Sequence, residues 1–103
     1  MSSRVEKLQE LLRQDPNSTF ARYGLAQEYA NAGQFEDAVR EYDALLAANP
    51  GYAAAYYHGG QTLERLGRID AARDLYQRGI AVTSQSGDAH ALSELEAALS
   101  LIS

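Results

Sequence analysis

The chain has 103 residues, 46% of them hydrophobic, which is long enough for one domain with a modest core and too apolar for a disordered chain. Fourteen acidic and nine basic residues give a net charge of -5 without a long basic run, which argues against nucleic acid or an anionic membrane as a partner. The absence of cysteine excludes disulfides and thiolate chemistry.

Apolar residues recur at steps of three and four along the chain, which is the spacing of helices. The predicted helices span residues 3–14, 19–32, 35–48, 53–66, 69–83 and 88–101. Pro16 ends the first helix because proline cannot continue the hydrogen-bond ladder, and residues 17–19 can cap the second. Gly33 and Gly67 supply the left-handed backbone conformation that ends a helix before a short turn. The sequence therefore predicts an all-α fold of antiparallel helical hairpins.

An internal repeat of 34 residues organises these helices. A shift of 34 superimposes residues of the same kind, namely Tyr23 on Tyr57, Gln27 on Gln61, Gly33 on Gly67, Ala38 on Ala72 and Tyr42 on Tyr76. The same shift backwards places Leu8 on Tyr42, so the first helix is half a repeat. We expect one domain with a half repeat at 1–17, repeats at 18–51 and 52–86, and a capping helix at 87–103.

The last predicted helix departs from the repeat. Its apolar residues form a single stripe that consists of Leu92, Leu95, Leu99 and Ile102. A terminal unit has a neighbour on one side only and must present a polar back to water. This stripe therefore fits a capping helix.

The period and its residues resemble the tetratricopeptide repeat family, whose signature is Trp, Leu-Gly, Tyr, Ala, an aromatic residue and Pro within 34 residues. The first copy has in these slots Arg22, Leu25-Ala26, Tyr29, Ala38, Tyr42 and Pro50. The second has Tyr56, Gly59-Gly60, Leu63, Ala72, Tyr76 and Ser84. Glycine inside a helix costs on the order of 1 kcal/mol relative to alanine. The pair Gly59-Gly60 either permits close approach of a neighbouring helix or tyrosine, or is a tolerated local weakness.

The resemblance implies a right-handed superhelix whose concave face is lined by the first helix of each pair. The positions it implies for a peptide-binding groove are Phe20, Tyr23, Gln27, Asn31, Tyr57, Gln61, Glu64 and Arg65, with Ala30 and Ala54 beside them. Spacing agrees in part, because Tyr23, Gln27 and Asn31 are four apart and lie off the predicted core face. Tyrosines offer contact area, amides can bond a peptide backbone, and an arginine can hold a carboxylate. In the alternative, these polar residues only solvate an exposed face and the tyrosines shield core edges.

One known binding mode of the family is not expected here. Members that hold a chaperone tail use Lys and Asn on successive first helices, then Lys and Arg on a third. The corresponding residues of this chain are Tyr23, Gln27, His58, Asp88 and Leu92, none of them basic in the sense of Lys or Arg. We therefore expect no binding of that tail motif.

Catalysis, metals and cofactors are not expected either. His58 and His90 are the only histidines and belong to no metal-spaced cluster, so we interpret both as structural or surface residues.

A charged N-terminus and the lack of a long apolar stretch predict a soluble, cytoplasmic protein. The main hypothesis is a non-enzymatic module that binds a peptide or protein segment. The alternative is a self-assembling scaffold, such as a homodimer, joined through apolar residues of a terminal helix.

Overall fold

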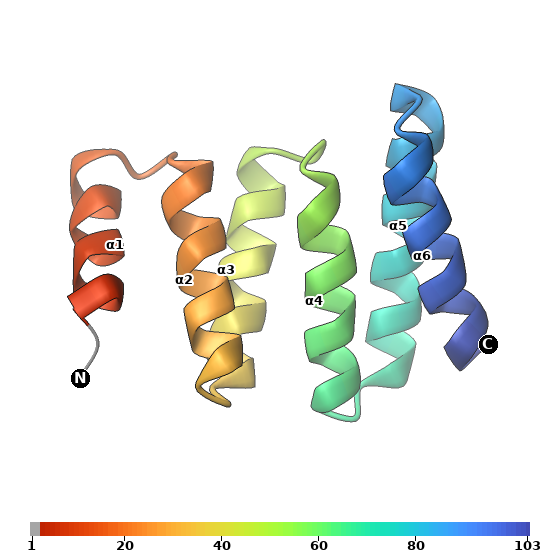
Figure 1. The fold of residues 1–103 in the computed structure, drawn as a ribbon, viewed down its shortest axis with the longest axis horizontal. Helices are drawn as coiled ribbons and strands as arrows, with labels where there is room; N and C mark the ends of the chain where they lie inside the picture. The colour runs from red at the N-terminus through yellow and green to blue at the C-terminus, as the bar shows by residue number, and fades with distance from the viewer. Residues whose placement is uncertain (1–2) are drawn as a thin grey trace.

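The computed structural model describes residues 3–103, and all regular structure in this range is helical. The helices are α1 (Ser3–Gln14), α2 (Thr19–Asn31), α3 (Phe35–Ala48), α4 (Ala53–Arg65), α5 (Ile69–Ser86) and α6 (Ala89–Ile102). They follow one another across the molecule as antiparallel neighbours, from α1 at one end to α6 at the other (Figure 1). The predicted all-α class is confirmed. The first two residues of the predicted half repeat lie outside the described residues.

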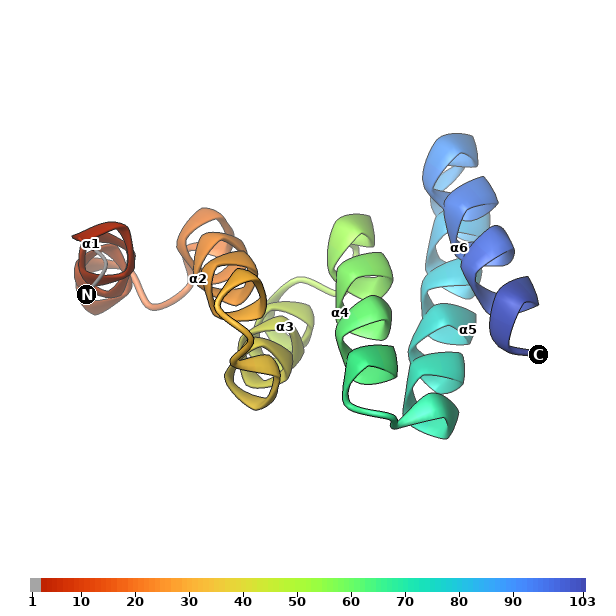
Figure 2. The same ribbon diagram turned by 60° about the horizontal axis from the view of Figure 1, so that its bottom comes forward.

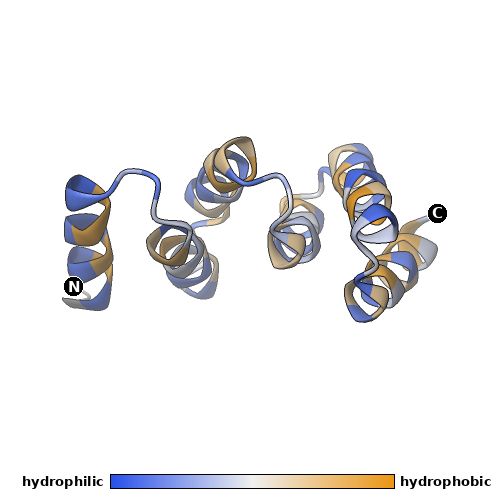
Figure 3. Cartoon of the chain, turned by 90° about the horizontal axis from the view of Figure 1, so that it is seen from above, coloured by the Kyte–Doolittle hydropathy of each residue, from blue (hydrophilic) through white to orange (hydrophobic). Residues whose placement is uncertain are grey.

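The helices form two rows. Seen from above, α2, α4 and α6 occupy one row and α3 and α5 the other (Figure 3). Each helix contacts the one before and the one after it, and α4 also contacts α6 within its row. The tilt of the helices changes along the stack (Figure 2), as expected of hairpin repeats that form a superhelix. The molecule measures 37 × 29 × 18 Å, so it is elongated along the direction of stacking.

The predicted turns and caps are present. Gly33 and Gly67 end α2 and α4 with positive φ angles of 79° and 77°. The Ser18 hydroxyl accepts a hydrogen bond of 3.2 Å from the backbone N–H of Ala21 and so caps α2. These local signals were readable from the sequence because each satisfies or ends a specific backbone ladder.

The predicted end of α5 was wrong by almost one turn. The helix continues past residue 83 to Ser86 and ends at Gly87, which has a φ of 78°. In the first repeat Pro50 follows the equivalent helix, whereas Ser84 stands in that slot here and leaves the hydrogen-bond ladder unbroken. The α6 helix consequently begins at Ala89.

Two groups of buried side chains hold the stack together. The larger runs through α2 to α6, and its buried members are Ala26, Ala38, Tyr42, Leu45, Leu46, Ala55, Tyr56, Leu63, Ala72, Leu75, Tyr76, Leu95 and Ala98. The smaller consists of Leu8, Ala21 and Leu25, and it joins α1 to α2. The apolar side of α1 is turned toward α2 (Figure 3). The N-terminal helix is therefore attached through a separate and smaller apolar contact than the other helices.

The two adjacent glycines of α4 lie where α5 approaches most closely. A Cβ atom on Gly60 would lie 2.2 Å from Cε1 of Tyr76, and one on Gly59 would lie 2.8 Å from Cδ2 of Leu75. Tyr76 is fully buried, and its hydroxyl donates a hydrogen bond to the Glu64 carboxylate. Close helix approach thus explains the glycines, and it outweighs their intrinsic cost to the helix.

We expect Gly60→Ala to destabilise the protein. An added methyl group in a packed core costs about 1–3 kcal/mol, and the contact with the Tyr76 ring puts this substitution at the upper end. Better helix propensity returns about 1 kcal/mol, so the net loss of unfolding free energy is about 2 kcal/mol. Urea denaturation followed by circular dichroism measures it.

Gly51→Ala is the matched control, because the nearest atom to its Cβ would be Oδ1 of Asn49 at 3.6 Å. Equal stability of the two variants would contradict the packing role of Gly60.

Candidate functional site

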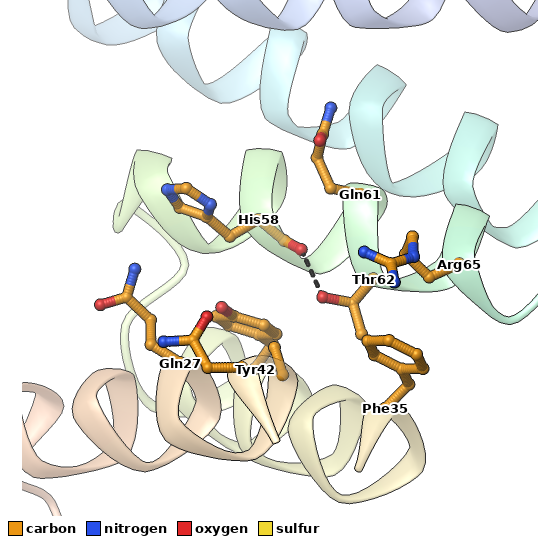
Figure 4. A pocket seen from close by; sticks show the side chains of 9 residues that line it. Gln27, Phe35, Tyr42, His58, Gln61, Thr62 and Arg65 are labelled. Atoms are coloured by element: carbon orange, nitrogen blue, oxygen red, sulfur yellow. Dashed lines mark hydrogen bonds between the residues drawn. The ribbon is translucent and has the colours of Figure 1, made fainter. Parts of the chain in front are cut away.

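An open hollow of about 320 Å³ lies between α2 and α4, with α3 contributing to its lining (Figure 4). We call it the central hollow; its lining residues are Gln27, Ala30, Asn31, Phe35, Tyr42, His58, Gln61, Thr62 and Arg65. The groove positions predicted from the sequence include Gln27, Ala30, Asn31, Gln61 and Arg65. The structure brings these five together.

Three amides give the central hollow its polar character. Gln27 and Asn31 lie one turn apart on α2, and Gln61 lies on α4 at the place equivalent to Gln27. The Nε2 of Gln27 donates a hydrogen bond of 3.2 Å to the Tyr23 hydroxyl. Asn31 is exposed and makes no side-chain hydrogen bond within residues 3–103. The amides therefore offer both donors and acceptors to a ligand in the hollow.

Arg65 is the cation of the central hollow. Its guanidinium carbon lies 4.8 Å from the centroid of the Phe35 ring, which comes from the start of α3 (Figure 4). This cation–π contact holds the side chain in place. Within the part of the chain that the structure describes, Arg65 has no carboxylate partner, since the nearby Glu36 is paired with Arg68. The arginine thus has a preferred position over the Phe35 ring and is accessible to an anionic group.

A cluster of aromatic rings lies beside the central hollow and contributes Tyr42 and His58 to its lining. The ring of Tyr23 lies 6.3 Å from that of Tyr42, 5.3 Å from that of Tyr52 and 6.0 Å from that of His58, measured between centroids. His58 also meets Tyr57 edge to face at 5.2 Å. Tyr23 is therefore partly buried against the core, and its hydroxyl links the aromatic cluster to the amide of Gln27.

Burial sets the protonation of His58. Removal from water lowers the pKa of its imidazole below 6.5, and the negative charge of Glu94 on α6 opposes this shift only in part. His58 is consequently neutral at pH 7, and the central hollow carries the charge of Arg65 alone among its basic side chains.

The remaining predicted groove residues lie elsewhere. Tyr57 lines a second hollow of about 210 Å³ between α4 and α6, the C-terminal hollow, together with Ala53, Ala54, Asp88, His90, Ala91, Glu94 and Leu95. Glu64 accepts the hydrogen bond from Tyr76 and lines neither hollow. Phe20 lies in a third, the N-terminal hollow, which is formed with Arg4, Lys7, Leu8 and Leu11.

Sequence reasoning missed several residues of the central hollow. The helical spacing of Phe35 and Tyr42 predicts core positions, and both also contribute rings to the lining. His58 and Thr62 stand one turn apart beside the predicted positions of α4, and this spacing was the available signal. The Thr62 hydroxyl already has a partner within α4, because it donates a hydrogen bond of 2.8 Å to the carbonyl oxygen of His58.

No three His, Asp or Glu side chains within residues 3–103 are grouped so that they could hold a metal ion. None of the described helices has both the length and the hydropathy that crossing a membrane requires.

Comparison with known proteins identifies the repeat. Residues 23–89 match the tetratricopeptide repeat family. A TPR repeat-containing protein of Pseudomonas aeruginosa is 26% identical over 91 residues, which cover 88% of this chain and 87% of that protein. A tetratricopeptide repeat domain protein from Salinibacter ruber has a TM-score of 0.80 and 39% identity, over 85% of this chain and 89% of its own. A protein from Bordetella parapertussis has a TM-score of 0.84 and 29% identity, over 99% and 89%.

The lowered pKa of His58 predicts a pH dependence of stability. The unfolded chain takes up a proton near pH 6.5, before the folded chain does, so the contribution of His58 is complete above that pH. It is lost as the pH falls through the lower, folded pKa. We expect the free energy of unfolding to fall more steeply for the wild type than for His58→Gln as the pH is lowered below about 6.5. Urea titrations of both proteins at each pH measure this difference, and parallel pH profiles would contradict it.

Proposed function

The chain belongs to the tetratricopeptide repeat family, and on that premise we propose that it is a non-enzymatic module that binds an extended protein segment in the central hollow. This fold generally mediates interactions between proteins. The observation that carries the proposal is the combination of amides from α2 and α4 with an arginine that has no carboxylate partner in the described chain.

The spacing of the amides suits a peptide backbone. Side chains one turn apart on a helix are separated by about 6 Å along its axis. Alternate residues of an extended peptide are separated by about 6.6–6.8 Å. Gln27 and Asn31 therefore match backbone groups two residues apart in an extended segment. Gln61 adds an amide from α4 at the edge of the hollow, where its side chain points away from Gln27 (Figure 4) and interacts with the Tyr76 hydroxyl. Amides bond N–H and C=O groups alike, so they support either direction of the peptide.

Arg65 adds a preference for negative charge. A carboxylate from an acidic side chain or a chain terminus can form charge-assisted hydrogen bonds with its guanidinium. Because Phe35 already holds the arginine, less side-chain freedom is lost on binding. The proposed partner segment thus carries an acidic group over Arg65 and a backbone in reach of the amides.

The shape of the site agrees with a segment of a protein rather than an enclosed small molecule. The central hollow is at the low end of ligand-pocket volumes and is open to solvent. No cofactor forms part of the proposal. A cytoplasmic location, the exclusion of nucleic acid and membranes, and the lack of chaperone-tail binding stay predictions, as do the domain boundaries.

Self-assembly as a scaffold is the second candidate. Large apolar side chains are exposed at the two ends of the stack, namely Leu11, Phe20 and Leu101. In the single chain α6 itself lies on α5, with Leu95 and Ala98 buried, so its stripe is partly occupied already.

We expect Arg65→Ala and the double substitution Gln27→Ala/Gln61→Ala each to weaken peptide binding at least about tenfold, the loss of about 1.4 kcal/mol. Both remove groups that contact the ligand in the proposed complex, and none of the three side chains is itself buried. Because Gln61 also interacts with the hydroxyl of the buried Tyr76, circular dichroism and thermal melting must first show that the double variant keeps its fold. The measurement is fluorescence anisotropy on acidic peptides selected with the wild type from an array of extended sequences.

The chain offers matched controls. Arg40→Ala removes an exposed arginine of α3 that is paired with Asp37, and Gln77→Ala removes an exposed amide of α5. Both should bind like the wild type. Binding that is equally strong in the hollow variants and in these controls would refute the site, and failure of the wild type to select any peptide would refute the function.

A further inference from the structure

α1 leaves Leu11 exposed at a position that the equivalent helices bury, whereas Leu8 is buried against α2. A shift of 34 residues places Leu8 and Leu11 of α1 on Tyr42 and Leu45 of α3. In α3 this face packs against α2, and Leu45 is 0% exposed. Leu11 is 42% exposed, because the described chain has no helix in the place that α2 occupies over α3.

The N-terminal hollow marks this open face. It has a volume of about 270 Å³, and besides Leu8 and Leu11 it is lined by Phe20, Arg4 and Lys7. The Phe20 side chain is 67% exposed and lies beside the exposed Leu11 in the lining of this hollow. The face is thus apolar at its centre and basic at its rim.

On α6 the charged Glu96 is exposed between the partly buried Leu92 and Leu99. The N-cap of α6 is Asp88 and the N-cap of α4 is Tyr52, so the two helices align at an offset of 36 residues. This offset places Leu92 on Tyr56, Glu96 on Gly60 and Leu99 on Leu63. The α4 residues face α5, since Gly60 adjoins Tyr76 and Tyr56 adjoins Gly79. In α6 the corresponding face has no following helix within the described chain, and Glu96 is exposed.

The geometry points to a second copy of this chain as the partner of both faces, with α6 of one copy lying on α1 of the next as α4 lies on α5. Within residues 3–103, α6 is equivalent to the first helix of a hairpin and no second helix follows it, and α1 is equivalent to the second helix of a hairpin and no first helix precedes it. Their contact rebuilds a complete hairpin and continues the stack. Such a head-to-tail contact uses two different faces and leaves one of each free, so it produces an open linear assembly.

The charges on the two faces match. Arg4 occupies the α1 place equivalent to Ala38 and Ala72, and Glu96 the α6 place equivalent to Gly60. Within one chain Gly60 packs on Tyr76, which lies one turn after Ala72. The equivalent contact between α6 of one copy and α1 of the next, which we call the joint, therefore brings Glu96 within reach of Arg4 of the next copy. The α6 helix contains Glu94 and Glu96 but neither Lys nor Arg.

The ion pairs that these charged residues form within one chain do not prevent the contact between two copies. Arg4 forms an ion pair of 3.0 Å with Glu28, but its side chain is 59% exposed and can reach a second carboxylate. The acidic residues of α1 do not line the N-terminal hollow, and Glu10 is paired with Arg13.

Two blocked variants test the proposal. The head-blocked variant is Leu11→Glu/Phe20→Glu, and the tail-blocked variant is Glu96→Arg/Ser100→Arg, where Ser100 is equivalent to Glu64 on the face toward α5. All four positions are exposed, so the fold should persist, as circular dichroism and thermal melting can verify. The exposed Ala47→Glu on α3 is the control for an added charge away from both faces.

The readout is average mass by sedimentation equilibrium from about 10 µM to about 1 mM, a range suited to a small interface. We expect the mass of the wild type and of Ala47→Glu to rise beyond that of a dimer, and each blocked variant alone to remain monomeric. An equal mixture of the two blocked variants should associate again, because it contains one intact head and one intact tail and also brings the acidic blocked head opposite the basic blocked tail. A monomeric wild type, association of either blocked variant alone, or a mixture that stays monomeric would overturn the proposal.

Discussion

The close contact between α4 and α5 is the constraint on which the rest of the stack depends. The ring of Tyr76 occupies space that any side chain on Gly60 would need, and Tyr56 approaches Gly79 in the same way. Two glycines, one on each helix, thus let two aromatic rings pack directly against backbone. Each helix is short and apolar along its buried side, so none can be stable in water without a neighbour that covers this side. The order of the helices in the stack follows from which face each one covers.

This packing also determines which side chains are left for function. Leucines such as Leu25 on α2 and Leu63 on α4 point into the core. The positions of α2 and α4 that do not face the core turn outward, and those of the two helices lie at the same level. The repeat places Gln61 at the level of Gln27, and it places Arg65 at the level of Asn31. A row of first helices therefore presents a periodic set of polar groups, and the amino-acid choice at those positions alone distinguishes one hollow from the next.

The same periodicity explains what could be predicted from the sequence. Helices, turns and the register of Gln27 with Gln61 depend on local signals and on the 34-residue shift, and all of these are visible in one chain. The end of α5 was missed because a slot without proline gives no positive signal where the helix stops. Phe35 was missed because it reaches the hollow from a second helix. The surroundings of Phe20 differ from those of Ala54 because no helix precedes α1 in the described chain, and a repeat pattern carries no information about its ends.

The ends and the hollows are connected through geometry. In a head-to-tail assembly the row of α2, α4 and α6 would continue from copy to copy, so the central and C-terminal hollows would alternate along one surface. The central hollow offers amides and Arg65, whereas the C-terminal hollow is lined by Asp88 and Glu94. A long partner with alternating acidic and basic groups would then meet complementary charges in turn. Each contact alone is small, but linked contacts raise the effective concentration of the next one, so assembly and partner binding would reinforce each other. The polarity that the joint requires, with an apolar and basic head and an acidic tail, would also give the bound partner a single direction along the stack.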